Sequence, residues 1–408
     1  MQQSSVFQDI SSPRPFKVDI PTDEVERMRR LISDTRLPQE PVVPEVGWDY
    51  GVDLAWLQTM RDAWLNEYDW KKAEREMNHL NHFLVTIESV SVHFIHHPST
   101  RPDAVPILLT HGWPGSFWEF HKMVEPLTNP PAGQPSFHVV IPSLPGFGFS
   151  GPPPKKMWDM QDNARILDHL MTGVLGYSSY MAQGGDWGSI MATVLGSTKF
   201  PACKLINLNM CGVSPPKTAF LTLPLFALPT SWRQWMMSFI YTEEEQRDFS
   251  RTVDVVKNIL GYFVPQATRP LSIGYALYDS PMGLLVWIGE RYKDLVDPEI
   301  LPCVREDILT TISIYFFTHT FHSAALPYYE NAGLVKKNLV ITKPLGLSRF
   351  PFDVNIPPIS WVKALHPNVV FVQRHERGGH FPGLEVPELL VGDLREMIVK
   401  NGALFGHG

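Results

Sequence analysis

The spacing of apolar and polar residues predicts helices at the start of the chain. Apolar residues three or four positions apart predict one helix that Thr22 or Asp23 can cap and a second over residues 54–68. Residues 83–96 then alternate between apolar and polar, which is typical of a hairpin of two strands. We therefore expect residues 1–95 to form an N-terminal meander that packs onto a larger body.

The pattern changes near residue 104, where short apolar runs bounded by glycine, proline or serine alternate with helical periodicity. Strands that alternate with helices predict a mostly parallel sheet flanked by helices, an α/β fold. Residues 215–330 interrupt this pattern with a helical, aromatic-rich stretch. We expect a core of residues 96–214 and 331–408 that carries this stretch as a helical cap. Counting the two strands of the hairpin, the cap follows the sixth predicted strand. The strands predicted in the core are 106–111, 137–142, 179–183, 203–211, 338–343 and 368–373, and its helices are near 160–175, 188–198 and 387–400.

The composition excludes several classes of function. The chain has 408 residues, 35 of them Lys or Arg and 42 Asp or Glu, and the net charge of −7 does not favour nucleic acid or an anionic membrane. Three cysteines without a Cys-x-x-Cys pair fit a reducing compartment. The N-terminus lacks the pattern of a signal peptide, and the longest apolar segment, from Ala219, is interrupted by proline. We expect a soluble cytoplasmic protein without a membrane anchor.

The stretch SYMAQGGDWGSIMATVLG has the form of a nucleophile elbow, a tight strand-to-helix turn in which small residues surround an exposed side chain. The central residue is Asp186, with paired glycines before it and Gly188 after it. Asp186 could instead only cap the helix predicted from about Ser189. The serine alternative, GFSGP around Ser150, has proline in the last small position, which disfavours a serine esterase. An aspartate nucleophile attacks carbon and forms an alkyl ester on the enzyme.

Hydrolysis of that ester needs donors for the oxyanion on the aspartate carbonyl. We expect one donor to be the backbone N–H of Trp187, directly after Asp186. The second is expected on the loop of residues 111–116, where Gly112 allows close backbone approach and the N–H of Trp113 is the candidate. The same loop could also be a simple turn that reverses the chain.

A base and an acid should follow the nucleophile in chain order. His380, preceded by two glycines, comes just after a predicted strand, and Asp353 follows the strand before it. The carboxyl ends of neighbouring parallel strands meet at one edge of a sheet, so we expect Asp353 to orient His380 there. His375 is a rival base that lacks the preceding glycines. His375 and His380 do not have the spacing of a helical zinc motif, and the other histidine groups resemble surface or core residues more than metal ligands.

With these residues in place, the chain resembles the epoxide hydrolases of the α/β-hydrolase superfamily, most of all the microsomal-type and fungal branch with an N-terminal meander. The resemblance rests on FKVDIPTDEVERMRRLI, LTHGWPGSFWEF, VIPSLPGFGFSG, QGGDWGS and GGHF, and it covers almost the whole chain. It implies the α/β-hydrolase fold, with Asp186 as nucleophile, His380 as the base that activates water and Asp353 as the acid. The product would be a vicinal diol, and no metal or organic cofactor is required.

The resemblance also implies two cap tyrosines that hold and protonate the epoxide oxygen. The matching positions are Tyr262 and Tyr328, and Tyr329 is an alternative to the second. A phenol suits this role because its ordinary pKa of about 10 keeps it protonated at neutral pH. A haloalkane or haloacid dehalogenase would share the Asp186 nucleophile, with the Trp187 indole holding halide, and a non-catalytic ligand-binding protein would share the fold.

The substrate class is suggested by aromatic residues in the predicted cap. They favour an apolar epoxide that can bear an aryl group, although the same side chains could only pack the cap on the core. The apolar cap also makes a homodimer plausible. These aromatic residues are Phe220, Phe226, Trp232, Trp235 and Trp287.

Overall fold

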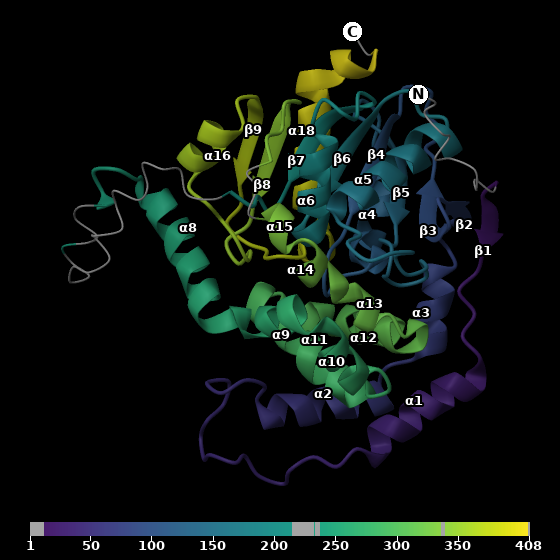
Figure 1. The fold of residues 1–408 in the computed structure, drawn as a ribbon, viewed down its shortest axis with the longest axis vertical. Coiled ribbons are helices and arrows are strands. Elements are labelled where there is room, and N and C mark those ends of the chain that lie inside the picture. The colour runs from purple at the N-terminus through teal and green to yellow at the C-terminus, as the bar shows by residue number, and fades with distance from the viewer. Residues whose placement is uncertain (1–11, 214–231, 233–236, 336–338, 407–408) are drawn as a thin grey trace.

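The computed structural model describes residues 12–213, 232, 237–335 and 339–406. The strands in these residues form one nine-stranded sheet in the order β1-β2-β3-β5-β4-β6-β7-β8-β9 (Figure 1). β1, β2, β3 and β5 pair antiparallel, and the pairs from β5 to β9 are parallel. The strands are β1 (Arg14–Phe16), β2 (His82–Ile87), β3 (Val90–His97), β4 (Val105–Thr110), β5 (Phe137–Pro142), β6 (Tyr180–Gly184), β7 (Cys203–Leu208), β8 (Leu345–Arg349) and β9 (Val369–Arg374).

Helices cover both faces of the sheet, which gives the predicted α/β-hydrolase fold. α5 packs on α6 on one face, and α4 packs on α18 on the other (Figure 1). The predicted hairpin of β2 and β3 is confirmed. The helices outside the large insertion are α1 (Thr22–Asp34), α2 (Leu54–Asn66), α3 (Trp70–Met77), α4 (His121–Thr128), α5 (Met160–His169), α6 (Asp186–Leu195), α16 (Ile359–Leu365), α17 (Pro382–Glu385) and α18 (Pro387–Asn401).

Two predictions are wrong, one about the cap of the first helix and one about a strand. α1 contains both Thr22 and Asp23, follows Pro21 and has no side-chain cap. The predicted strand over 338–343 is absent from its described residues, 339–343, because the Ile341 N–H donates to His366 and the amides of the next two residues donate to Gly196.

The strand that occupies this place is β8, which the sequence pattern did not predict. Every residue of β8 is buried, and its Gly346 faces Met397 of α18 so closely that a Cβ would collide with the sulfur. The glycine at this close contact weakens the strand signal in the sequence. The short β1 was also not predicted, so the helical insertion follows the seventh strand rather than the sixth.

A helical insertion between β7 and β8 lies across one end of the sheet (Figure 1). α1 and α2 contact its α11 from the side away from the sheet, so the insertion is held between the N-terminal helices and the core. Its helices are α8 (Glu243–Asp254), α9 (Phe263–Thr268), α10 (Pro270–Leu277), α11 (Pro281–Leu295), α12 (Arg305–Thr318), α13 (Phe321–Ala324), α14 (Leu326–Glu330) and α15 (Ala332–Val335). None of the helices in the described parts of the chain combines the length and apolar character that crossing a bilayer requires.

Candidate active site

Asp186 lies at a sharp turn between β6 and α6 and has a φ of 46°, in the left-handed region that few residues other than glycine adopt. The turn depends on small neighbours. A Cβ at Gly184 would overlap the carbonyl of Gly188, and a Cβ at Gly188 would overlap the carbonyl of Thr110. α6 begins at Asp186 itself, three residues before the predicted start. The local geometry is that of a nucleophile elbow.

The Asp186 carboxylate is held from the loop after β4. The Trp113 backbone N–H donates to Asp186 Oδ1 over 2.7 Å, and a Cβ at Gly112 would collide with the same oxygen. The hydroxyl of Tyr315, in α12, donates to the carbonyl of Gly115 over 2.9 Å and fastens this loop to the helical insertion. The N–H of Trp187 lies in the first turn of α6, where a helix has no internal acceptor for it.

Asp353 and His380 come together with Asp186 at the carboxyl ends of three parallel strands. His380 Nδ1 lies 2.6 Å from Asp353 Oδ1, and His380 Nε2 lies 3.4 Å from Asp186 Oδ2. Asp353 is fully buried, and its Oδ1 also accepts from the N–H of Val354 over 2.6 Å. The loops after β8 and β9 therefore place one imidazole between two carboxylates.

The glycines before His380 shape its loop. Gly378 has a φ of 91°, and a Cβ at Gly379 would overlap the carbonyl of Leu295, the last residue of α11. The same carbonyl accepts from the His380 N–H over 2.8 Å. The helical insertion thus contacts the backbone of the loop that carries the imidazole.

The two carboxylates determine the charge of His380. Burial alone would lower the pKa of the imidazole, but the charges and hydrogen bonds of Asp353 and Asp186 outweigh burial and raise that pKa well above 6.5. Burial raises the pKa of Asp353, and the nearby His380 opposes this effect. The imidazole is consequently protonated at neutral pH.

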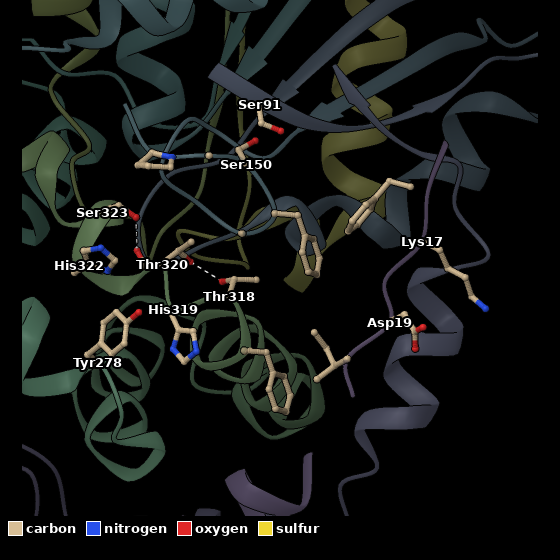
Figure 2. A pocket seen from close by; sticks show the side chains of 17 residues that line it. Lys17, Asp19, Ser91, Ser150, Tyr278, Thr318, His319, Thr320, His322 and Ser323 are labelled. Atoms are coloured by element: carbon tan, nitrogen blue, oxygen red, sulfur yellow. Dashed lines mark hydrogen bonds between the residues drawn. The ribbon is translucent and has the colours of Figure 1, made fainter. Parts of the chain in front are cut away.

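His375, the rival base, and the pair His319 and His322 lie in other surroundings. His375 Nε2 lies 2.8 Å from Asp393 Oδ2, and the ring stacks on Phe350. His319 and His322 pack on Tyr278 in a separate cavity of about 640 Å³, which the N-terminal segment, the loop after β5 and the helical insertion enclose (Figure 2).

Two tyrosines from the insertion face Asp186 across a cavity of about 300 Å³ that all three residues line. Tyr262 and Tyr328 are 8% and 3% exposed, and their ring centroids lie 5.9 Å apart in an edge-to-face arrangement. Burial is the main reason that both phenol pKa values lie above 10. The Tyr328 hydroxyl forms no hydrogen bond of ordinary geometry with the described residues. Tyr329 is 50% exposed and lines a different cavity.

The wall of the Asp186 cavity is mostly apolar. Of the cap aromatics in the sequence, Phe220, Phe226 and Trp235 lie outside the described residues. Trp232 is 63% exposed, and the Trp287 indole donates to Gln266 over 2.9 Å. The side chains that form the apolar wall come from α6, the segment after β7 and the insertion, and they include Ile190, Met210, Val255, Val256, Leu260 and Phe263.

Sequence analysis missed several charged residues near the site. Arg291 is buried and lies over the ring of Tyr262. Arg251, in α8, donates to the carbonyl of Phe352 over 3.0 Å and so holds the loop of Asp353. Burial raises the pKa of Glu119 to about 8 and that of Glu385 to about 7. No motif marks these residues, because their importance depends on distant parts of the chain.

Comparison with known proteins identifies the family. The family model described as "Epoxide hydrolase N terminus" matches residues 13–120, and that described as "alpha/beta hydrolase fold" matches residues 105–255. The chain is 33% identical to epoxide hydrolase 1 of Sus scrofa over 95% of this chain and 88% of that protein. The structure of Aspergillus niger epoxide hydrolase superposes on this one with a TM-score of 0.83. The two sequences are 36% identical, and the match covers 96% of this chain and 97% of that one. The crystal structure of juvenile hormone epoxide hydrolase from Bombyx mori matches with a TM-score of 0.87 and 26% sequence identity. The match covers 97% of this chain and 96% of that one. The chain belongs to the epoxide hydrolase family, enzymes of the α/β-hydrolase fold that hydrolyse epoxides.

Proposed function

We propose that this enzyme converts an epoxide and water to a vicinal diol in two steps, through an ester on Asp186. The observation that carries the proposal is the arrangement of the Asp186 carboxylate. One oxygen accepts the Trp113 N–H, the other lies 3.4 Å from His380 Nε2, and the residue lines an apolar cavity. In the first step Asp186 attacks an oxirane carbon, and the bond between that carbon and the ring oxygen breaks.

Tyr262 and Tyr328 are the proposed acids for the departing oxygen. They line the cavity together with Asp186, and a buried phenol remains protonated at neutral pH. Ring opening produces a basic alkoxide, which takes a proton from a phenol. The position of the Tyr328 hydroxyl supports this role, because it is close to Tyr262 and Trp187 but forms no hydrogen bond of ordinary geometry with the described residues, so it can donate to a bound epoxide.

In the second step His380 removes a proton from water, and the water oxygen attacks the ester carbonyl of Asp186. The bond between the carbonyl carbon and the substrate oxygen then breaks, and that oxygen takes the other proton of the water. The diol leaves and Asp186 is a carboxylate again. Esterification neutralises Asp186, so His380 loses one of the two carboxylates that hold its pKa high. The imidazole then becomes a better base, while Asp353 still orients it and stabilises its charged form. The amides of Trp113 and Trp187 are the proposed donors to the oxyanion.

The substrate that this cavity favours is a small apolar epoxide. A volume of about 300 Å³ is at the lower end of ligand pockets. Its wall is mostly aliphatic and aromatic, and its polar lining includes Asp186, Tyr262 and Tyr328. The proposed steps involve side chains, backbone amides and water, with no metal or organic cofactor.

The test is the intact mass of the His380→Gln variant after exposure to an aryl epoxide. Without its base the enzyme should stop at the ester, so an added mass equal to the whole epoxide is expected. The adduct should be absent when Asp186→Ala is added. An adduct only from a haloalkane, without the mass of the halide, would indicate dehalogenase chemistry. No adduct from either compound would contradict the covalent mechanism.

A further inference from the structure

A buried arginine lies directly behind one of the proposed acids. Arg291, in α11, is 3% exposed, and its Cζ lies 4.9 Å from the ring centroid of Tyr262. Burying a guanidinium is costly unless its charge and donors are satisfied. Its Nη1 donates to the carbonyl of Ile259 over 2.5 Å, and its Nη2 pairs with Glu290 and, over 3.2 Å, with Asp294. Arg291 is therefore held in place against the Tyr262 ring from several sides.

The face of an aromatic ring attracts a cation, and it does so far more strongly once the phenol has lost its proton. Burial is the largest influence on the pKa of Tyr262 and raises it, the charge of Asp186 raises it further, and Arg291 lowers it. Asp294, the partner of Arg291, acts in the raising direction. The cation therefore opposes three effects that would make the phenol a poor acid: burial, the charge of Asp186 and the charge of Asp294. Because Arg291 does not line the cavity, it reaches the reaction only through Tyr262.

We propose that Arg291 is a positioning residue that promotes proton donation by Tyr262 during epoxide opening. The proposal rests on the function proposed above. As the carbon–oxygen bond breaks, the Tyr262 proton moves to the ring oxygen, and the negative charge left on the phenolate lies beside the Arg291 cation. Between the two steps the phenolate takes the proton that His380 holds in the free enzyme, directly or through solvent, and the neutral His380 then takes a proton from water in the second step. The charge of Arg291 does not change in the cycle.

Ester formation can be measured alone in the His380→Gln background, where the reaction is expected to stop at the adduct. In that background Arg291→Gln, which removes the charge, should slow adduct formation about tenfold or more, equivalent to at least about 1.4 kcal/mol in the barrier. Arg291→Lys should recover most of the rate. With His380 restored, Arg291→Gln should change the rate of ester hydrolysis by less than roughly threefold.

Lys293→Gln is the matched control. Lys293 also belongs to α11, and its Nζ lies 5.0 Å from the ring centroid of Trp48, away from the cavity. Its loss should leave ester formation unchanged. An equal effect of Lys293→Gln and Arg291→Gln would mean that loss of a helix charge, rather than contact with Tyr262, slows the reaction, and would contradict the proposal.

A double-mutant cycle with Tyr262→Phe separates this inference from the proposed function. If Arg291 acts through the phenol, Arg291→Gln should add less than roughly twofold to the loss that Tyr262→Phe causes. Full additivity of the two losses would overturn the role of Arg291. A Tyr262→Phe variant that forms the adduct at the wild-type rate would instead contradict the assignment of Tyr262 as an acid.

Arg291→Gln could also damage folding, so a variant that keeps Arg291 provides a second test. Asp294→Asn removes a negative charge that opposes the effect of Arg291 on Tyr262. The Asp294 side chain is 22% exposed, so the change should be tolerated. Ester formation should become faster, by roughly threefold. An unchanged or slower rate in a folded Asp294→Asn protein would contradict the proposal.

Discussion

His380 Nε2 lies 3.4 Å from Asp186 Oδ2, on the opposite side of the imidazole from Asp353. The imidazole therefore interacts with both the carboxylate that we propose as nucleophile and the carboxylate that orients the base. Only the charge of Asp186 is lost on esterification, whereas the charge of Asp353 remains. The same contact can thus hold His380 protonated in the free enzyme and release it as a base in the intermediate.

Asp353→Asn should lower the pKa of His380, because the charge of Asp353 is a large part of what raises it. A protonated imidazole cannot accept a proton, so ester hydrolysis is lost as pH falls through the pKa that His380 has in the ester, where the charge of Asp353 remains. The acid limb should therefore move to lower pH in the variant. The plateau rate should drop by roughly two to four orders of magnitude, since the imidazolium loses its stabilising charge. Single-turnover decay of the ester across pH measures both effects, and an unmoved acid limb would disprove this account.

Gly112→Ala should slow ester formation strongly while leaving the fold intact. The new Cβ would collide with Asp186 Oδ1, so either the carboxylate or the Trp113 amide that binds it must move. A displacement of this size is expected to cost about 100-fold or more in rate. The time course of adduct formation, followed by intact-protein mass, measures the loss of rate.

The matched control for this substitution is Gly392→Ala. Gly392 is exposed in α18, and a Cβ there meets nothing within 4 Å. Alanine in a helix should slightly increase thermal stability and leave the rate unchanged. If both alanine variants react at the wild-type rate, close contact at Gly112 is not needed.

The choice between the adjacent tyrosines can be tested by removing one hydroxyl at a time. Tyr328→Phe should slow ester formation by about 100-fold, within the usual contribution of a general acid. Tyr329→Phe should react normally because its side chain is half exposed and does not line the Asp186 cavity. Rapid mixing with an epoxide in the His380→Gln background measures both rates. The reverse order of the two effects would move the acid to Tyr329.

Stability should decrease in acid partly through His366. This residue is 2% exposed, its Nδ1 accepts the Ile341 N–H over 3.1 Å, and burial lowers its pKa to about 4. In the unfolded chain a histidine has a pKa of about 6.5. Between these values the unfolded state binds more protons, so the free energy of unfolding falls as pH falls from about 6.5 to 4, by up to about 3 kcal/mol.

His366→Asn tests this effect, because the amide oxygen can still accept the Ile341 N–H but does not titrate. Urea unfolding at several pH values should show a shallower dependence on pH in the variant. Part of the dependence should remain, since burial also lowers the pKa of His111 to about 4. Parallel curves for the variant and the wild type would exclude His366 as a contributor.

Features that depend on neighbouring residues, such as turns and the order of strands and helices, could be predicted from the sequence. The glycines around Asp186 predicted a tight turn, and the structure has a positive φ at Asp186. The two glycines before His380 helped to distinguish it from His375, and Gly378 also has a positive φ. The alternation of strands and helices predicted the mostly parallel sheet, which brings the ends of β6, β8 and β9 to one edge. Failures occurred where packing outweighs the local pattern, as in β8, whose Gly346 lies against the Met397 side chain.

The sequence by itself therefore determined the fold class and the turns that bring Asp186, Asp353 and His380 to one edge of the sheet. Turns and periodicity depend on residues close together in the chain, so they can be read from it. Only the tertiary structure decided that Tyr328 rather than Tyr329 faces Asp186 and that Arg291 lies on the ring of Tyr262. Burial and through-space charge depend on groups that are distant in sequence, and no local pattern records them.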